Sequence, residues 1–428
     1  MIDRTKLPPV SEISGLKLQS IQQFTLRNGI TMNIVNHCEA DVCKIVLLWN
    51  GGKYDVNGKY GLSLMTSLLL NGTTQHTSDQ ITELFDFYGS KVSCTCDNHF
   101  TKFSLKALNR TLPDLLPLVL EILQHATFPE NELSAKARKL YASESMQQKT
   151  VQFQSANLCK TLFFPPQHPA ITDDNIEDIK NITRDDIIAI YNDVIKGVKP
   201  EIYLAGNITQ EVQSILKATF ENLQTGKAGQ KQRIVPILQD VKAQTKKLFM
   251  PNQVQSSLDI AIPIGNCIES DYYKLRPATV ALGGYFGSRL NKIIREEKGL
   301  TYGIRASIVN TLEGKVIYIN SQCAGKNADE VIEEIIRQIN ILKTESISNK
   351  ELTSVRRYYL SALSNTSESI FSTLDYYISC YTVGVSLNSF TEREKTIHNL
   401  TAEDITTAAK TYFNTDKMLT AIAGDIKE

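Results

Sequence analysis

Neither sign of charge predominates in this sequence, which has 46 Lys and Arg against 46 Asp and Glu in 428 residues. Nucleic acids and anionic membranes select basic surfaces, so the balance argues against a general binder of either. The apolar runs fall far short of the roughly 20 residues that cross a bilayer. The first twenty residues contain no apolar core of a secretory signal, and their acidic residues are unlike a transit peptide. The expected location is therefore the cytoplasm.

Cysteines are scattered rather than clustered, with 8 in the chain. Without a signal peptide, reduced thiols are expected. Cys94 and Cys96 alternate on a predicted strand and could face one ligand, with His99 in the turn that follows. No second pair of residues has the spacing of a zinc site, however, so a strand with two small buried side chains is the favoured interpretation.

The chain does contain a repeat. Residues 182–208 and 400–426 align without gaps at an offset of 218, and each predicts a Thr-capped helix, a turn, a strand and a final glycine. Gly89 and Gly299, 210 residues apart, each stand between a predicted helix and a predicted strand. These correspondences predict two copies of one domain, residues 1–224 and 241–428. Residues 225–240 begin with a polar, glycine-containing stretch that is typical of a linker.

Hydrophobic periodicity predicts similar elements in both halves. Helices are expected at 60–70, 78–88, 112–124, 130–148 and 154–163, and again at 273–282, 289–297, 328–342 and 349–363. Strands are expected at 31–35, 44–49, 91–96, 100–105, 256–262, 302–309 and 316–323. Because strands cluster with strands and helices with helices, the expected fold class is α+β, with an antiparallel sheet packed with helices in each half.

The stretch Gly61-Leu-Ser-Leu-Met-Thr-Ser-Leu68, followed by Gly72-Thr73, resembles a motif of the insulinase/pitrilysin zinc peptidases, the M16 family. The family pattern is Gly-Leu-Ala-His-x-x-Glu-His and then Gly-Thr. The resemblance covers nearly the whole chain and implies two homologous metallohydrolase-like domains. It places Leu64 and Leu68 at the positions of the two zinc-binding histidines and Ser67 at the position of the general-base glutamate.

The chemistry of that motif is absent from this chain. Two histidines at i and i+4 share a zinc ion on one helix face, and the glutamate deprotonates the zinc-bound water. A leucine has no lone pair to donate, and Ser67 has no useful basicity near neutral pH. Glu144 stands near the position of the family's third ligand, and one carboxylate without imidazole partners cannot hold zinc. We therefore expect no cofactor in this chain.

A second family motif is retained. Residues 282–304 match a pattern in which a glycine-containing loop leads to a helix bearing Arg, with a Tyr seven residues later, and Arg295 and Tyr302 have that spacing. In active relatives this pair reaches the substrate and the oxyanion from the domain opposite the zinc. An Arg fork can bind peptide carbonyls, and a Tyr hydroxyl can donate to an oxyanion. Without the family context, the two residues fit an ordinary charged helix end and a strand-packing side chain.

The loop itself contains Gly283, Gly284 and Gly287. The resemblance allows these residues a part in substrate binding. A helix break that permits close backbone packing is an equally good interpretation.

Together, the missing ligands and the retained pair predict a non-catalytic subunit of a heterodimeric zinc metallopeptidase. The partner would be a zinc-bearing M16 homologue, and this chain would bind unfolded peptide by edge-strand addition and complete the partner's site with Arg295 and Tyr302. The chain alone is expected to show no metallopeptidase activity. Two alternatives stay open, namely a purely structural subunit of an assembly and a homodimeric peptide-binding protein without catalysis.

Overall fold

The computed structural model describes residues 5, 13–37, 40–56, 58–171, 175–226, 232, 234–265 and 267–426. The chain packs into two compact units. One comprises residues 19–236 and 369–384 and is called the N unit here; the other comprises residues 1–18, 237–368 and 385–428 and is called the C unit. Within the linker expected at 225–240, residues 227–231 and 233 lie outside the described residues.

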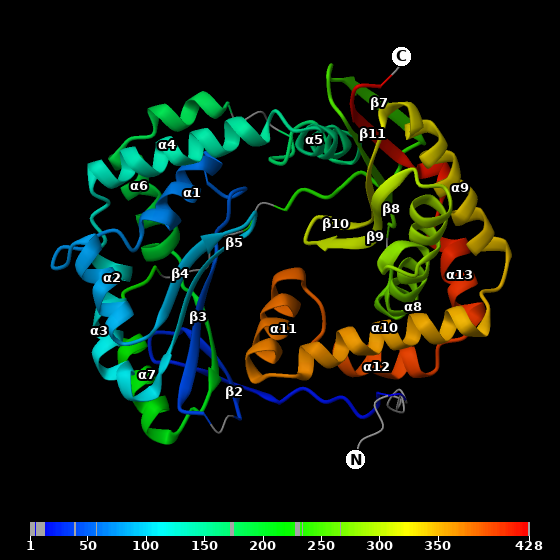
Figure 1. The fold of residues 1–428 in the computed structure, drawn as a ribbon. Helices are drawn as coiled ribbons and strands as arrows, with labels where there is room; N and C mark the ends of the chain where they lie inside the picture. The colour runs from blue at the N-terminus through cyan, green and yellow to red at the C-terminus, as the bar shows by residue number, and fades with distance from the viewer. Residues whose placement is uncertain are drawn as a thin grey trace. The chain divides into compact units, whose positions relative to one another are not determined.

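The N unit contains a six-stranded sheet in the order β1-β2-β6-β3-β5-β4 (Figure 1). The parallel pair is β2 with β6, and the other neighbouring strands are antiparallel, so the sheet is mixed. Strand β4 therefore lies at one edge. The strand bounds are β1 (Ile21–Thr25), β2 (Thr31–Asn36), β3 (Val42–Asn50), β4 (Lys91–Cys96), β5 (Phe100–Leu108) and β6 (Glu201–Gly206).

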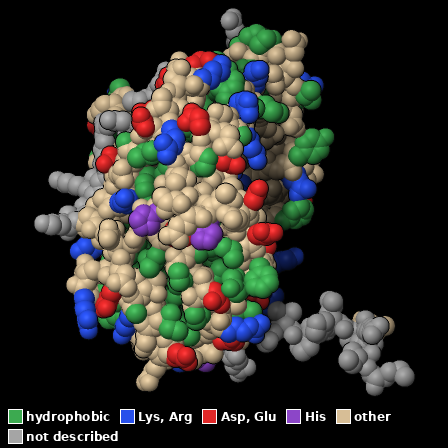
Figure 2. All heavy atoms as spheres, turned by 90° about the vertical axis from the view of Figure 1, so that its left-hand side faces the viewer, with side chains coloured by type: hydrophobic (Ala, Val, Ile, Leu, Met, Phe, Trp, Pro, Cys, Tyr) green, Lys and Arg blue, Asp and Glu red, His purple; other side chains and the backbone are tan. Residues whose placement is uncertain are grey.

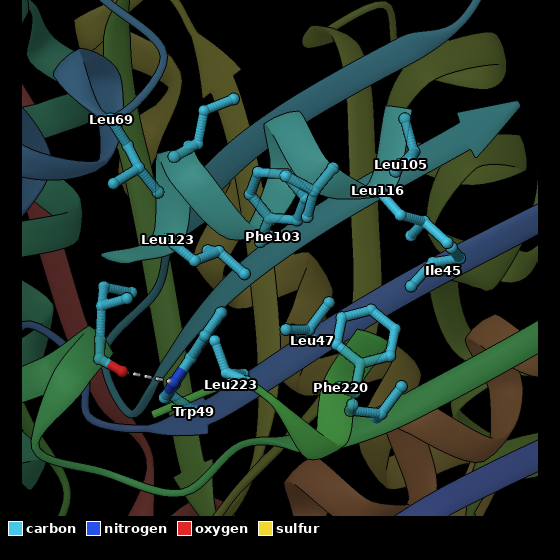
Figure 3. Packing of buried hydrophobic residues seen from close by; sticks show 14 of the residues in the cluster. Ile45, Leu47, Trp49, Leu69, Phe103, Leu105, Leu116, Leu123, Phe220 and Leu223 are labelled. Carbon is cyan, nitrogen blue, oxygen red and sulfur yellow. Dashed lines mark hydrogen bonds between the residues drawn. The ribbon is translucent and has the colours of Figure 1, made fainter. Parts of the chain in front are cut away.

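Helices cover one face of this sheet and bury its alternate side chains. On β3, Ile45, Leu47 and Trp49 belong to this core, and Figure 3 shows them with Phe103 of β5. The indole Nε1 of Trp49 donates to the carbonyl of Ile195 at 3.2 Å, so the only polar atom of that ring is satisfied. The helices are α1 (Lys59–Leu68), α2 (Ser78–Phe87), α3 (Leu112–His125), α4 (Glu130–Gln147), α5 (Val151–Phe163), α6 (Arg184–Tyr191) and α7 (Gln210–Glu221).

Helix α11 (Ile370–Val383) covers part of the opposite face of the same sheet, although it lies in the C-terminal half of the sequence. Lys44 of β3 forms a salt bridge with Asp375 at 2.7 Å. The hydroxyl of Tyr377 donates to the carbonyl of Gln19 at 2.8 Å. These contacts join residues more than 300 positions apart, and the sequence analysis predicted no element in this segment.

The C unit contains a five-stranded sheet in the order β7-β11-β8-β10-β9, with β7 parallel to β11 and the other neighbours antiparallel. Strand β9 lies at one edge. The strands are β7 (Gln244–Phe249), β8 (Ser256–Pro263), β9 (Thr301–Thr311), β10 (Gly314–Cys323) and β11 (Leu419–Gly424). The helices are α8 (Glu269–Thr279), α9 (Ala328–Thr344), α10 (Asn349–Ser367), α12 (Ser389–His398) and α13 (Ala402–Tyr412), with π-helical segments η4 (Val280–Gly284) and η5 (Asn291–Glu297).

Apart from β1, the two sheets have the same connectivity, with β2, β3, β4, β5 and β6 corresponding to β7, β8, β9, β10 and β11. The predicted Thr caps are also equivalent, because Thr183 and Thr401 each form a capping box with the Asp three residues later. Gly206 and Gly424 end the equivalent strands with the same φ of 149°. The predicted α+β class with duplicated domains is therefore confirmed, and each sheet is mixed rather than wholly antiparallel.

Candidate functional site

The helix that corresponds to the zinc motif is α1, and its two key side chains belong to the core of the N unit. Leu64 and Leu68 are 1% and 0% exposed and pack in the same cluster as Trp49. Because residues four positions apart share a helix face, both point into that core. Ser67 is exposed instead, and its Oγ donates to the carbonyl of Leu64 at 2.9 Å.

These residues do not fit a zinc ion. Neither leucine offers a lone pair, and the hydroxyl of Ser67 bonds to its own helix. Glu144 lies half-buried on α4, which packs against α1. In the described part of the chain, no group of three His, Cys, Asp or Glu side chains is arranged to hold a metal. Leucines fit these buried positions of α1 well, because burying an apolar side chain does not require the removal of a charge from water.

Arg295, the first retained residue, lies on η5 in the C unit. Its guanidinium carbon lies 4.6 Å from the centre of the Phe286 ring, a cation–π contact. Neighbouring Glu296 and Glu297 are exposed, and no described carboxylate lies within salt-bridge distance of Arg295. The guanidinium is therefore oriented by an aromatic face, and none of the described carboxylates forms an ion pair with it.

Tyr302, the second retained residue, opens edge strand β9 and is 88% exposed. The backbone beside it is fixed, because Thr301 Oγ1 donates to the carbonyl of Gln322 at 2.6 Å and Ser321 Oγ donates to Thr301 Oγ1 at 2.9 Å. The phenol ring thus extends into solvent from a rigid strand end. An aromatic side chain so little covered gives the fold almost no burial energy, so packing does not account for it.

Asn291 joins the three segments that make up this region. Its buried amide nitrogen lies 3.2 Å from the carbonyl of Tyr285 in the glycine loop, 3.2 Å from Ser288 Oγ and 2.9 Å from the carbonyl of Ile304 in β9. One side chain therefore holds the loop, η5 and β9 together. Arg295 is one helical turn further along the same segment, so its position depends on this junction.

The C-terminal end of η5 is tied to α9. Lys298 Nζ lies 3.1 Å from a carboxylate oxygen of Glu330 and 3.1 Å from one of Glu334. These hydrogen bonds, which Lys298 donates to Glu330 first and to Glu334 second, raise the pKa of Lys298 above its ordinary value. Because Lys298 lies between Arg295 and Tyr302 in sequence, the tie fixes the turn that connects them.

The loop glycines have different surroundings. A Cβ at buried Gly283 would lie 2.8 Å from the backbone nitrogen of Ala306, so a side chain there would collide with β9. A Cβ at Gly284 would lie 3.0 Å from Val280, and one at exposed Gly287 would lie 3.0 Å from the Tyr285 ring. Close packing of η4 on β9 thus requires glycine most strictly at Gly283.

We expect Asn291→Ala to lower the free energy of unfolding by about 1–3 kcal/mol, because it removes the buried amide donor that the carbonyls of Tyr285 and Ile304 share. It should also expose Arg289, in the adjoining segment, to trypsin. Urea unfolding and limited trypsin digestion measure the two effects. Asn340→Ala, at an exposed position of α9, is the matched control and should change stability by less than about 0.5 kcal/mol. Equal stabilities of the two variants would contradict the role of Asn291.

The sequence analysis did not identify the contribution of Phe286 or Asn291. The one available signal was the position of Asn291 four residues before Arg295, on the same side of the helix.

Cys94 and Cys96, which the sequence analysis considered as metal ligands, lie on β4, where Cys96 Sγ is 3.7 Å from Thr66 Oγ1 of α1. Burial raises the pKa of the Cys94 thiol above its ordinary value, as expected for an unreactive strand residue.

Fold and site together define a two-domain α+β protein in which core leucines lie at the positions that the family motif gives to zinc ligands. Comparison with family models gives the same class. The model "Insulinase (Peptidase family M16)" matches residues 33–165, and the model "Peptidase M16 inactive domain" matches residues 181–359. Together the two models match well over half of the chain. The chain therefore belongs to the M16 peptidase family.

Individual relatives are distant in sequence and similar in fold. A Bacillus subtilis protein described as "Uncharacterized zinc protease YmxG" is 22% identical over 78% of this chain and 81% of its own length. The crystal structure of a peptidase M16 inactive domain from Pseudomonas fluorescens has a TM-score of 0.84 at 21% identity, covering 95% of this chain and 98% of that one. A protease from Helicobacter pylori has a TM-score of 0.82 at 17% identity, covering 95% and 100%.

No described helix combines the length and the apolar character that crossing a bilayer requires.

Proposed function

We propose that this chain is the zinc-less subunit of a two-subunit M16-type metallopeptidase, which binds extended peptide and completes the active site of a zinc-bearing M16 partner with Arg295 and Tyr302. The observation that supports this most directly is that Tyr302 is exposed and that Arg295 is not engaged in a described salt bridge. Tyr302 is 88% exposed at the start of an edge strand, and the Arg295 guanidinium rests on the Phe286 ring without a salt-bridge partner among the described residues.

The two residues suit complementary tasks. The planar fork of Arg295 has donors for one or two peptide carbonyls, and its aromatic support reduces the motion lost on binding. The Tyr302 hydroxyl has a donor for an oxygen that becomes negative during peptide cleavage. Chemistry at zinc would be supplied by the partner, since the positions on α1 do not fit a metal.

Edge strands supply the means of holding a peptide. Strands β4 and β9 occupy equivalent edges of the two sheets, and each has one side that no described strand pairs with. Such an edge presents a row of backbone donors and acceptors to an extended segment. Recognition through the backbone depends little on peptide sequence and so suits an unfolded substrate.

The test uses the purified chain and the zinc-bearing M16 homologue from the same organism, separately and mixed. We expect no stoichiometric zinc by elemental analysis and no cleavage of quenched fluorescent casein by this chain alone. The mixture should elute as a heterodimer on gel filtration and cleave casein in a chelator-sensitive way, at least tenfold faster than the homologue alone. One tightly bound zinc and chelator-sensitive cleavage in the purified single chain would overturn the proposal. A stable homodimer that does not bind the zinc-bearing homologue would also overturn it.

A further inference from the structure

A groove between α2 and α3 of the N unit is separate from the residues discussed above. It has a volume of about 610 Å³, and its lining includes Leu84 of α2 and Tyr88 directly after that helix, Pro117 and Leu118 of α3, and His76 from the segment before α2. Figure 2 shows this side of the molecule, where histidine side chains adjoin a hydrophobic patch with acidic and some basic side chains around it. A volume of several hundred Å³ is sufficient for large side chains of a ligand.

The two helices that form the groove carry acidic residues but no Lys or Arg. Segments α2 and α3 carry five acidic residues and neither Lys nor Arg, in a chain whose overall charge is zero. Two of these acids line the groove, namely Asp114 and Glu121. The five are Asp79, Glu83, Asp86, Asp114 and Glu121. The two helices therefore contribute only negatively charged carboxylates to this region, which favours a positively charged occupant.

Glu121 is held in the groove as an anion. Its carboxylate accepts from Thr73 Oγ1 and lies 2.9 Å from Nδ1 of His76. Desolvation acts to raise the pKa of Glu121, yet the hydrogen bonds from Thr73 and His76 outweigh it and hold that pKa below its ordinary value. A carboxylate whose side chain is only 10% exposed thus stays charged at neutral pH in the lining of the groove.

An unpacked aromatic side chain adjoins the groove. Phe87, the last residue of α2, is 79% exposed, and its ring lies 5.1 Å from that of Tyr88, which lines the groove. Its exposure leaves apolar area that the fold does not cover. A large apolar contact beside a negatively charged groove is complementary to a segment that carries both apolar and basic side chains.

We propose that the α2–α3 groove is a docking site for a peptide segment of a partner protein in which a large apolar residue is flanked by Lys or Arg. The apolar residue packs against Phe87, Leu84 and Leu118, and the flanking cations face Asp114 and the other acids of the two helices. Nucleic acids and anionic lipid surfaces would be repelled by the same acids. The site is independent of Arg295 and Tyr302, which lie in the C unit.

Three blocked, fluorescein-labelled hexapeptides test the proposal: Lys-Lys-Leu-Phe-Lys-Lys, Glu-Glu-Leu-Phe-Glu-Glu and Lys-Lys-Ser-Ser-Lys-Lys. Binding to the full chain is measured by fluorescence anisotropy at about 0.15 and about 1 M salt. We expect the first peptide to bind at least tenfold more tightly than the other two and to weaken at high salt. Phe87→Ala and Asp114→Asn should each weaken it by roughly three- to tenfold.

Two controls match these variants. Met146→Ala removes an apolar side chain that is 73% exposed on α4, and Glu333→Gln neutralises an exposed acid on α9. Both should leave binding unchanged. Circular dichroism checks that every variant is folded, and Phe87 and Asp114 are exposed enough that substitution should not disturb the core.

Several outcomes would overturn the proposal. These are equal affinity for the acidic and basic peptides, no binding at millimolar concentration, or binding that both groove variants leave intact. Sedimentation velocity can give a further contradicting outcome. If the chain self-associates and Phe87→Ala abolishes that association, the groove binds a second copy of this chain instead of a partner protein.

Discussion

Replacing Tyr302 by Phe in the proposed heterodimer is expected to lower kcat about 10²–10³-fold, the usual cost of losing one donor to an oxyanion. The substitution removes only a hydroxyl from a side chain that is 88% exposed, so assembly and melting temperature should not change. Replacing Arg295 by Ala is expected to act mainly on KM, because the guanidinium would contact carbonyls that are present in the bound substrate as well as in the transition state. Steady-state kinetics of the mixed subunits measure both parameters.

Tyr358→Phe and Arg357→Ala are the matched controls for these variants. Both residues are exposed on α10 of the same unit, and neither is one of the proposed substrate-binding residues. The ring of Tyr358 stacks on Tyr285 of the glycine loop at 5.2 Å, and the Phe variant keeps that ring contact. Their heterodimers should retain full activity. If Tyr302→Phe and Arg295→Ala are as active as these controls while assembly is intact, the chain is a structural subunit and its retained pair has no role in cleavage.

Gly206→Ala is expected to destabilise the N unit by more than about 4 kcal/mol, or to prevent its folding. Gly206 ends β6 with a φ of 149°, and a Cβ there would lie 2.1 Å from the carbonyl oxygen of Val42 in the neighbouring strand. The obstructing atoms belong to the backbone of a central strand pair, so no side chain can move aside to relieve the collision.

The control for this effect is Gly89→Ala in the same unit. Gly89 also has a positive φ, 58°, but a Cβ there meets no atom within 4 Å. Its replacement should cost only about 1–2 kcal/mol of backbone strain. The chain has one Trp, and Trp49 is fully buried in the N unit, so its fluorescence during urea unfolding reports on this unit. A smaller loss for Gly206→Ala than for Gly89→Ala would contradict the explanation.

Local features of the sequence were sufficient to predict the organisation of the fold. The capping boxes at Thr183 and Thr401 depend on residues three positions apart, and the glycines at 89 and 299 end a helix by their own conformational freedom. Their recurrence at constant offsets indicated the duplicated domain. The substitutions at Leu64 and Leu68 were equally plain, because a leucine has no lone pair and cannot bind a metal in any fold. Ser67 is equally plain at the general-base position, because a hydroxyl has no useful basicity near neutral pH.

What the sequence could not provide depends on contacts between distant residues. The packing of α11 on the N-unit sheet rests on pairs such as Lys44 and Asp375, which no local periodicity relates. Nor does a short pattern show that β9 is an edge strand, since that follows from the order of all five strands.

The same division holds for the sites. Sequence alone determined that the chain has a duplicated M16-like architecture, lacks zinc ligands on α1 and keeps an Arg and a Tyr at family spacing. Only the tertiary structure decided that Arg295 rests on Phe286, that Tyr302 is left exposed, and that α2 and α3 enclose an acidic groove. The physical reason is that residue identity fixes what a side chain can do chemically, whereas its exposure and its partners are set by how the whole chain packs.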